Sequence, residues 1–186
     1  MCNYNFVKRL LDVFFAVALL IGLAPILVII AVLLKIFSEG PILFAQERLG
    51  KDSKPFKIIK FRTMKTDAPN KAARDIDNNE YVTKFGKLLR RTSLDELPQL
   101  LNILKGEMSF VGPRPFIPNE GEIIDLRKAF QIDKLKPGLT GWAQVIARDT
   151  CDQREKLKLD LYYKNNISIL FDTKIILHTF FSLNGK

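Results

Sequence analysis

The segment from residue 13 to residue 34 constrains the fold most strongly, because every residue in it except Gly22 and Pro25 is apolar. As one unbroken helix it would be about 33 Å long, which is enough to cross the hydrocarbon core of a bilayer. A cleavable signal peptide fits poorly, since its apolar region is shorter and ends at a small-residue cleavage site. A buried helix of a soluble protein rarely presents so long an apolar surface on all sides. The sequence therefore predicts a segment that enters a membrane.

The flanks and the centre of this segment favour a re-entrant hairpin over a straight span. Lys8 and Arg9 precede it and Lys35 follows it, so the positive-inside rule has no asymmetry to act on. Pro25, near the centre, removes a backbone donor and kinks a helix. We therefore expect a helix-break-helix hairpin over residues 1–38, with the break at Pro25 and with Lys8 and Arg9 at the membrane surface. A straight span is the alternative.

The charge balance of the chain restricts its partners. The 186 residues include 29 Lys and Arg against 20 Asp and Glu, a formal net charge of +9. This favours anionic partners, namely nucleic acid, acidic lipid headgroups or phosphorylated substrates. Cys2 and Cys151 have no metal-binding or redox spacing, and His178 lies in an apolar C-terminal segment where it suits packing. These features argue against a His-based nucleophile relay and against a His-rich metal site.

A basic stretch follows the apolar segment. Its cations are Arg48, Lys51, Lys54, Lys57, Lys60, Arg62 and Lys65, and Asp52 is its one acid. Phe56, Ile58, Ile59 and Phe61 interleave with these charges, which predicts a half-buried strand with a basic edge. The basic edge has three interpretations: a solvated lysine face, a contact with lipid headgroups or nucleotide phosphates, and an RNA-binding strand.

Asp95 and Glu96 are adjacent carboxylates between a basic run and an apolar run. Ser93 and Glu96 match the S-x-x-E capping box, in which case Asp95 merely suits the positive end of a helix dipole. Alternatively, adjacent carboxylates near positive charge suit a divalent metal, usually magnesium when phosphates are present. A carboxylate can also attack phosphorus and form an acyl phosphate. The second interpretation predicts phosphoryl or phosphosugar transfer to a lipid.

Arg114 lies between Pro113 and Pro115, which fix the backbone on either side. A guanidinium held this rigidly loses little entropy when it grips a phosphate. The alternative is an ordinary proline-rich turn with a solvated arginine.

The segment from residue 137 to residue 145 is punctuated by Gly138 and Gly141, which permit a close approach of the backbone to a ligand. It has neither a Walker nor a Rossmann spacing, so it predicts a phosphate cradle only weakly. Trp142 either stacks on a base or anchors the chain at a membrane interface.

The remaining segments complete an α+β prediction. Residues 108–111 predict a short strand, and helical patterns cover residues 81–89, 97–104, 119–130 and 155–164. Residues 168–183 are too short and interrupted for a span, so an interfacial or core-packed helix is expected. The expected fold is a mostly helical, membrane-associated domain with a small β element, an N-terminal re-entrant helix-break-helix and amphipathic interfacial helices.

Taken together, these motifs resemble the bacterial sugar transferases, the small monotopic phosphoglycosyl transferases that start glycan assembly on polyprenol phosphate. The resemblance covers nearly the whole chain in order and spacing. It is carried by Lys8-Arg9 with Asp12, Ala24-Pro25, residues 56–64, Lys84-Phe85-Gly86, residues 93–100, residues 105–115 and residues 137–145. The family breaks its hairpin at a Ser-Pro pair, whereas this chain has Ala24-Pro25 and so lacks the hydroxyl.

The resemblance implies roles for individual residues. Asp95 would be the catalytic nucleophile, attacking the sugar-bearing phosphorus of a UDP-sugar and releasing UMP. Glu96 would be the second catalytic acid and the magnesium ligand. The residues expected to bind the substrate are Arg91, Arg114, Lys60, Arg62, Pro137, Gly138, Thr140, Gly141 and Gln144.

The resemblance also implies partners and a location. A UDP-sugar would be the donor, polyprenol phosphate the acceptor and Mg²⁺ the cofactor, on an anionic phospholipid bilayer and without nucleic acid. Residues 39–186 would form the catalytic domain on the cytoplasmic face of the inner membrane, with both termini on that side. The chain lacks the additional spans of longer members, so a minimal catalytic unit is expected.

Two other functions fit parts of the sequence. One is direct transfer through a ternary complex without a covalent step. The other is a membrane-tethered nucleic-acid-binding protein, suggested by the net charge and the strand over residues 56–61. The second leaves the Asp95-Glu96 pair and the rigid Arg114 without a role.

Overall fold

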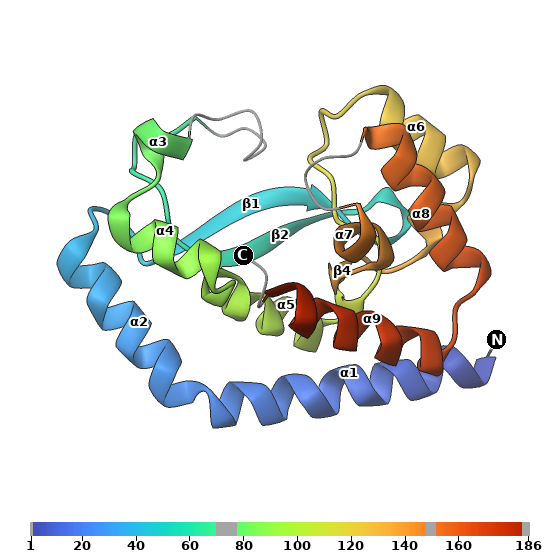
Figure 1. Ribbon diagram of the computed structural model, residues 1–186, viewed down its shortest axis with the longest axis horizontal. Coiled ribbons are helices and arrows are strands. Elements are labelled where there is room, and N and C mark those ends of the chain that lie inside the picture. Colours follow the sequence, from blue (N-terminus) through green and yellow to red (C-terminus); the bar gives the residue numbers. More distant parts are fainter. Residues whose placement is uncertain (1, 70–77, 148–151, 184–186) are drawn as a thin grey trace.

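The computed structural model describes residues 2–69, 78–147 and 152–183, which form a mostly helical protein with two small two-stranded sheets (Figure 1). This confirms the predicted α+β class. The long α1 (Cys2–Gly22) runs along one side, and α2 (Ala24–Phe37) turns away from its end. The other elements lie on one side of this helix pair.

The predicted helix-break-helix is present. The axes of α1 and α2 differ by 62°, and the break falls at Leu23. Pro25 lies in the first turn of α2, where a missing N–H is not needed by the helix. Within the described ranges, no single helix is both long and apolar enough to cross a bilayer, and only this bent pair meets that test jointly.

The strands β1 (Leu43–Leu49) and β2 (Pro55–Phe61) form an antiparallel hairpin around the 3₁₀ turn η1 (Lys51–Ser53). Phe56, Ile58 and Phe61 are buried, as the predicted half-buried strand requires. They pack on both N-terminal helices, against Ala16 of α1 and against Ile30 and Leu34 of α2. The two N-terminal helices α1 and α2 are therefore part of the hydrophobic core.

Along the chain, β2 is followed by four helical segments before the second sheet begins. They are α3 (Asn78–Tyr81), α4 (Lys84–Arg91), η3 (Leu94–Gln99) and α5 (Leu100–Lys105). The short strands β3 (Ser109–Val111) and β4 (Gly138–Thr140) then pair in parallel. The segment between these strands contains α6 (Glu122–Ala129) and η4 (Ile132–Lys134). The chain continues with α7 (Trp142–Ile146), α8 (Gln153–Asn165) and α9 (Ile169–Leu183).

Polar contacts lock α1 onto the rest of the protein. The buried Asp12 accepts hydrogen bonds from Ser109 Oγ and from Phe110 N, both at 3.1 Å. Arg9 donates to the last carbonyls of α5, at 2.6 Å to Ile103 O and 2.8 Å to Leu104 O. These contacts satisfy groups that a helix C-terminus leaves unpaired. The sequence prediction placed Arg9 at the membrane surface and missed this internal role.

A second lock joins α1 to α9. The buried Asp172 accepts from Lys8 Nζ at 2.6 Å and from Tyr4 OH and Tyr163 OH, each at 2.8 Å. Each carboxylate oxygen therefore has a partner, as a buried charge requires. Lys8, like Arg9, uses its charge inside the protein.

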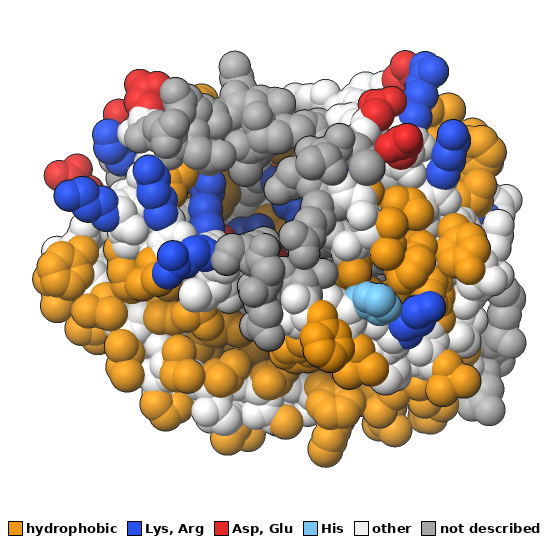
Figure 2. Space-filling view, viewed as in Figure 1, with side chains coloured by type: hydrophobic (Ala, Val, Ile, Leu, Met, Phe, Trp, Pro, Cys, Tyr) orange, Lys and Arg blue, Asp and Glu red, His pale blue; other side chains and the backbone are white. Residues whose placement is uncertain are grey.

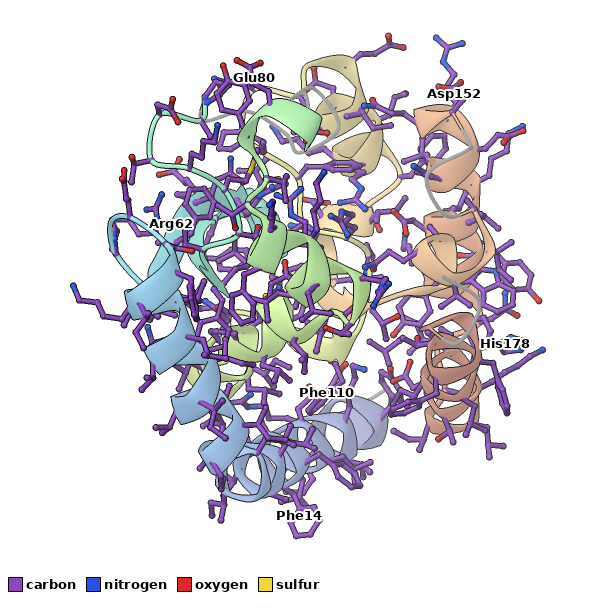
Figure 3. The ribbon with its side chains drawn as sticks, turned by 60° about the vertical axis from the view of Figure 1, so that its left-hand side comes forward. Phe14, Arg62, Glu80, Phe110, Asp152 and His178 are labelled. Carbon is purple, nitrogen blue, oxygen red and sulfur yellow. The ribbon has the colours of Figure 1, made fainter. Side chains whose placement is uncertain are left out.

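The helices α1, α2 and α9 expose large apolar side chains. We call those that are more than half exposed the apolar face: Phe6, Leu10, Phe14, Ile21, Val28, Ile29, Val32, Ile36, Phe37, Leu170, Leu177, Phe180 and Phe181. Hydrophobic side chains cover the lower margin of Figure 2, where Figure 1 places α1 and α2. Figure 3 shows Phe14 pointing away from the body of the protein. Soluble monomers rarely expose contiguous apolar surface on this scale.

The helix α9 therefore has two sides. Ile175 is fully buried against Val111 and Tyr163, while Leu170 is 85% exposed. The expectation of an interfacial or core-packed helix thus resolves into a helix that is packed on one side and apolar but exposed on the other.

Candidate functional site

A shallow cleft lies where β1, β2, η3, β4, α7 and the segment after β3 meet. Its lining residues are Arg48, Ile58, Lys60, Glu96, Gln99, Arg114, Pro115, Gly138, Leu139 and Gln144. The structure thus brings together five predicted site residues that are far apart in the sequence: Lys60, Glu96, Arg114, Gly138 and Gln144. Cations and amides dominate its polar lining, which suits an anionic ligand.

The local structure around Asp95 differs from the predicted capping box. Ser93 has φ 57° and ψ 17°, in the left-handed region, and its side chain caps no N–H. The helix that follows is the 3₁₀ helix η3, and the capped helix start in this region belongs to α4, where Thr83 Oγ1 accepts from Gly86 N at 2.9 Å. The capping-box prediction is therefore wrong. A left-handed non-glycine residue is strained, and the turn at Ser93 delivers Asp95 to the interior.

Asp95 is buried with a side-chain environment that opposes ionisation. Burial raises the pKa of its carboxyl above the ordinary value of 3.8, and the neighbouring Glu96 raises it further. The positive charges of Lys60 and Arg90 act in the opposite direction. Glu96 points to the cleft and accepts a hydrogen bond from Lys60 Nζ at 2.6 Å. The two adjacent acids thus have different environments, one buried and one at the cleft.

The arginine close to Asp95 is Arg90, which was not among the predicted site residues, whereas Arg91 was predicted to bind the substrate. Arg90 Nε donates to Thr63 Oγ1 at 2.9 Å, and burial lowers the pKa of the Arg90 guanidinium while Asp95 opposes that shift. Arg91 is exposed and does not line the cleft. Helical spacing in the sequence is the signal that could have distinguished Arg90 from Arg91. Arg90 is four residues after the buried Gly86 and therefore lies on the same side of α4.

Replacing Lys60 by Met is expected to raise the pKa of the Asp95 carboxyl further, because it removes a positive charge that favours the ionised form. The measurement is a ¹³C NMR titration of the Asp95 carboxyl. Lys57→Met is the matched control, since Lys57 is an exposed cation on the same strand. An Asp95 titration midpoint that is equal in both variants would contradict the electrostatic role of Lys60.

Arg114 is held as firmly as its flanking prolines predict, and hydrogen bonds contribute as well. The carbonyls of four successive residues each accept from another part of the chain. The pairs are Pro113 O with Gly138 N at 3.0 Å, Arg114 O with Arg127 Nη1 at 2.8 Å, Pro115 O with Arg48 Nη1 at 3.3 Å and Phe116 O with Leu49 N at 2.8 Å. The Arg114 side chain is exposed at the cleft and forms no ion pair with any described residue.

Gly138 and Gly141 allow two backbone segments of the protein to pack closely against each other. A Cβ at Gly138 would lie 2.1 Å from Gly112 N, and a Cβ at Gly141 would lie 2.1 Å from Gly112 O. The close approach is therefore between two backbones rather than to a ligand. Pro137 O accepts from Ser109 N at 2.9 Å, and Thr140 Oγ1 contacts Thr179 Oγ1 of α9 at 2.7 Å. Of these residues, Gly138 alone lines the cleft.

Two amides in the cleft have polar atoms that no described residue satisfies. Gln144 Nε2 donates to Leu139 O at 3.2 Å, but the buried Gln144 Oε1 has no partner. Gln99 Nε2 is also buried without a partner. Unpaired buried groups in a cleft are where a ligand gains specific hydrogen bonds. Gln99 was not among the predicted site residues, and nothing in its sequence context singles it out.

Five of the residues predicted to bind the substrate do not line the cleft, namely Arg91, Pro137, Thr140, Gly141 and Arg62. The side chain of Arg62 has partners of its own. Its Nε donates to Pro41 O at 2.9 Å and its guanidinium lies 5.7 Å from the centre of the Phe44 ring. It does not line the cleft. Side chains of successive strand residues point to opposite faces, so Arg62 would share a face with Lys60 if β2 continued. However, β2 ends at Phe61, so this alternation does not extend to Arg62.

The carboxylates can hold a metal ion only with help from a ligand. Within the described ranges, no group of three or more His, Cys, Asp and Glu side chains is arranged as a metal site. Mg²⁺ in phosphate-handling sites is commonly held by one or two carboxylates together with substrate phosphates and water. The Asp95-Glu96 donor set fits that kind of site, with Glu96 as the cleft-facing ligand.

Comparison with known proteins finds a family model and relatives that match nearly the whole chain. The family model described as "Bacterial sugar transferase" matches residues 3–186. An exopolysaccharide production protein PSS from Rhizobium leguminosarum bv. phaseoli is 41% identical over 184 residues, which cover 92% of each chain.

Two relatives have names that specify an activity. A UDP-glucose:undecaprenyl-phosphate glucose-1-phosphate transferase from Escherichia coli (strain K12) is 42% identical over 94% of this chain. A UDP-N-acetylgalactosamine-undecaprenyl-phosphate N-acetylgalactosaminephosphotransferase from Aeromonas hydrophila is 38% identical over 95% of this chain. The chain spans only 39% and 43% of the lengths of these two relatives. The match over nearly all of its own residues nevertheless shows that the chain belongs to the bacterial sugar transferase family.

Proposed function

We propose that this protein transfers a sugar-1-phosphate from a UDP-sugar to polyprenol phosphate and releases UMP, as the first membrane step of a surface glycan pathway. The observation that carries the proposal is the buried Asp95 beside a cleft lined by Lys60, Arg48 and Arg114. Positive side chains of this kind neutralise charge that develops on a transferring phosphoryl group. The names of the two transferases from Escherichia coli and Aeromonas hydrophila support the same donor and acceptor classes.

The proposed reaction has two displacements at one phosphorus. Asp95 attacks the sugar-bearing phosphorus of the donor, the bond from that phosphorus to the bridging oxygen breaks, and UMP leaves with that oxygen. A phosphate oxygen of the polyprenol phosphate then attacks the same phosphorus and releases the Asp95 carboxylate. Asp95 must be ionised to attack, so the opposing effects of burial and of Lys60 and Arg90 on its pKa set the active fraction.

Magnesium, held by Glu96 and by the donor phosphates, would supply charge neutralisation in the cleft. Lys60 would orient Glu96 through the 2.6 Å contact between Lys60 Nζ and Glu96 Oε1. Arg114 would grip the donor phosphates, and the unpaired atoms of Gln99 and Gln144 would bind polar groups of the nucleotide or sugar.

The test is UMP release from a panel of UDP-sugars, with polyprenol phosphate and with magnesium varied. We expect release with one donor or a few related donors, loss of release on chelation, and a higher magnesium requirement for Glu96→Gln. Parallel lines in initial-rate plots are expected from the covalent route, whereas intersecting lines would support direct transfer in a ternary complex. No release from any donor would refute the proposal.

We further propose that the apolar face enters one leaflet of an anionic bilayer from the cytoplasmic side, as a re-entrant and monotopic anchor. The 62° bend between α1 and α2 and the exposed side chains of α9 support this placement. Residues 39–186 would then carry the cleft above the lipid.

Charged substitution tests this membrane placement. Phe14→Glu places a charge on the apolar face at a residue that is 63% exposed, so the fold should persist while flotation with vesicles weakens. Leu43→Glu is the control, because Leu43 is also exposed but lies on β1, outside the apolar face. Equal flotation of both variants would argue against this face as the anchor.

A further inference from the structure

Arg127 connects Arg114 to a helix that contributes no residue to the cleft. Arg127 is a residue of α6, and Arg127 Nη1 donates to Arg114 O at 2.8 Å. Of the four hydrogen bonds that fix residues 113–116, two have backbone N–H donors. The other two have the side chains of Arg48 and Arg127 as donors. Arg48 lines the cleft itself, whereas Arg127 acts from behind the Arg114 segment.

The Arg127 side chain is fixed on two further sides. Its Nη2 donates to Asp160 Oδ2 of α8, and its guanidinium lies over the Phe116 ring, 4.0 Å from the ring centre. The side chains of Arg127 and Asp160 are only 12% and 5% exposed. A buried guanidinium that binds a carboxylate and a carbonyl while it stacks on a ring has little freedom to move. The position of Arg114 O is therefore tied to α8 through two side chains.

We propose that Arg127 and Asp160 are positioning residues that brace Arg114, so that α8 determines how tightly the cleft holds the donor phosphates. The inference rests on the proposed function in one respect, which is that Arg114 binds those phosphates. Neither Arg127 nor Asp160 touches the substrate in this arrangement. Their effect is transmitted through the backbone of Arg114.

A purely structural role for the pair predicts something different. Arg127 and Asp160 join α6 to α8, and a simple staple between helices would affect stability and not donor binding. A second ion pair joins the same two helices, with Arg154 Nη2 at 3.2 Å from Glu122 Oε1 and both side chains more than two thirds exposed, at 71% and 72%. Among the residues that the structure describes, neither member of that pair is hydrogen-bonded to residues 113–116, so the pair provides the matched control.

The experiment measures steady-state kinetics of UMP release for four single variants and one double variant of the full chain. Arg127→Lys keeps the charge but cannot hold both partners in the geometry of a guanidinium. We expect it to raise the KM for the UDP-sugar about 10- to 100-fold, because small misplacements of a phosphate-binding group have effects of this size. The KM for polyprenol phosphate should change by less than about 2-fold, since bracing of Arg114 concerns donor binding.

Phe116→Leu, which removes the stacking ring and keeps both charges, should give a smaller rise in the donor KM. Arg154→Lys should leave it unchanged.

The double variant separates bracing from a general loss of structure. If Arg127 acts through Arg114, then Arg127→Lys has almost no further effect on the donor KM in an Arg114→Ala background. Equal effects in both backgrounds would overturn the inference. So would a normal donor KM in Arg127→Lys while Arg114→Ala is impaired, and the proposed function would survive both results. A normal donor KM in Arg114→Ala would instead refute the phosphate-binding role of Arg114, and the inference with it.

Discussion

Replacing Asp95 by Asn is expected to abolish turnover and to make the folded protein more stable. The amide cannot attack phosphorus, so UMP release should fall by at least about 10⁴-fold, as expected for removal of a nucleophile. No phosphosugar adduct should appear in the intact-protein mass spectrum after incubation with the donor alone. An adduct on the variant would show that another residue is the nucleophile.

The gain in stability follows from the pKa of Asp95. Burial and Glu96 raise that pKa above 3.8, so the folded state holds the proton more tightly than the unfolded state. The stability that this group contributes is fully present at low pH and is lost as the pH rises through the folded pKa. Asn never ionises, and removal of a strained active-site charge commonly stabilises a protein by about 0.5–2 kcal/mol.

The pH dependence of thermal unfolding checks this sign. The Tm difference between Asp95→Asn and the wild type should vanish near about pH 3, where the Asp95 carboxyl is protonated in both states. It should grow as the pH rises toward neutrality. Asp125→Asn is the control, because its side chain is 82% exposed and it should show no such trend. A Tm advantage that is independent of pH would contradict the electrostatic explanation.

Replacing Gly138 by Ala is expected to have the largest effect on stability. The new Cβ would lie 2.1 Å from Gly112 N and 2.3 Å from Thr140 O, and both obstacles are backbone atoms that cannot rotate away. Separating β3 from β4 to relieve the clash would break the hydrogen bond from Gly138 N to Pro113 O. We expect a loss of about 3–5 kcal/mol in the free energy of unfolding, which lowers the Tm by about 10 °C in a chain of this size.

Gly22→Ala is the matched control for this substitution. Nothing lies within 4 Å of a Cβ at Gly22, at the end of α1. Alanine there should leave stability unchanged or raise it by up to about 1 kcal/mol. If both variants unfold at the wild-type temperature, the crossing of the two backbones at Gly112 is looser than the structure indicates.

The sequence predicted the parts of the fold that depend on local pattern. The apolar run with Pro25 gave the broken helix pair, the alternation around Phe56 and Ile58 gave β2, and the prolines around Arg114 gave a rigid segment. These features follow from residues that are neighbours in the chain, where periodicity and backbone restriction act directly.

The sequence did not predict the features that depend on distant residues. Asp12 meets Ser109, and Arg127 meets Asp160, across long separations without any periodic signal. The left-handed turn at Ser93 was missed because the S-x-x-E pattern favours a capped helix, and burial of Asp95 and Pro98 overrides that local preference. The resemblance implied Arg91 as a substrate-binding residue and did not point to Arg90, because a basic run in the sequence does not show which of its members points inward.

The bend between α1 and α2 has a mechanical consequence. Two rods that bend by 62° where they join, with α9 beside the first, do not lie along one line. A body that rests on a soft surface along one line can roll about that line, whereas supports in two directions prevent rolling and pitching. On a bilayer, the tilt of the protein would thus be fixed by its own framework and not by the lipids. The mouth of the cleft would thus keep a constant height and tilt above the bilayer.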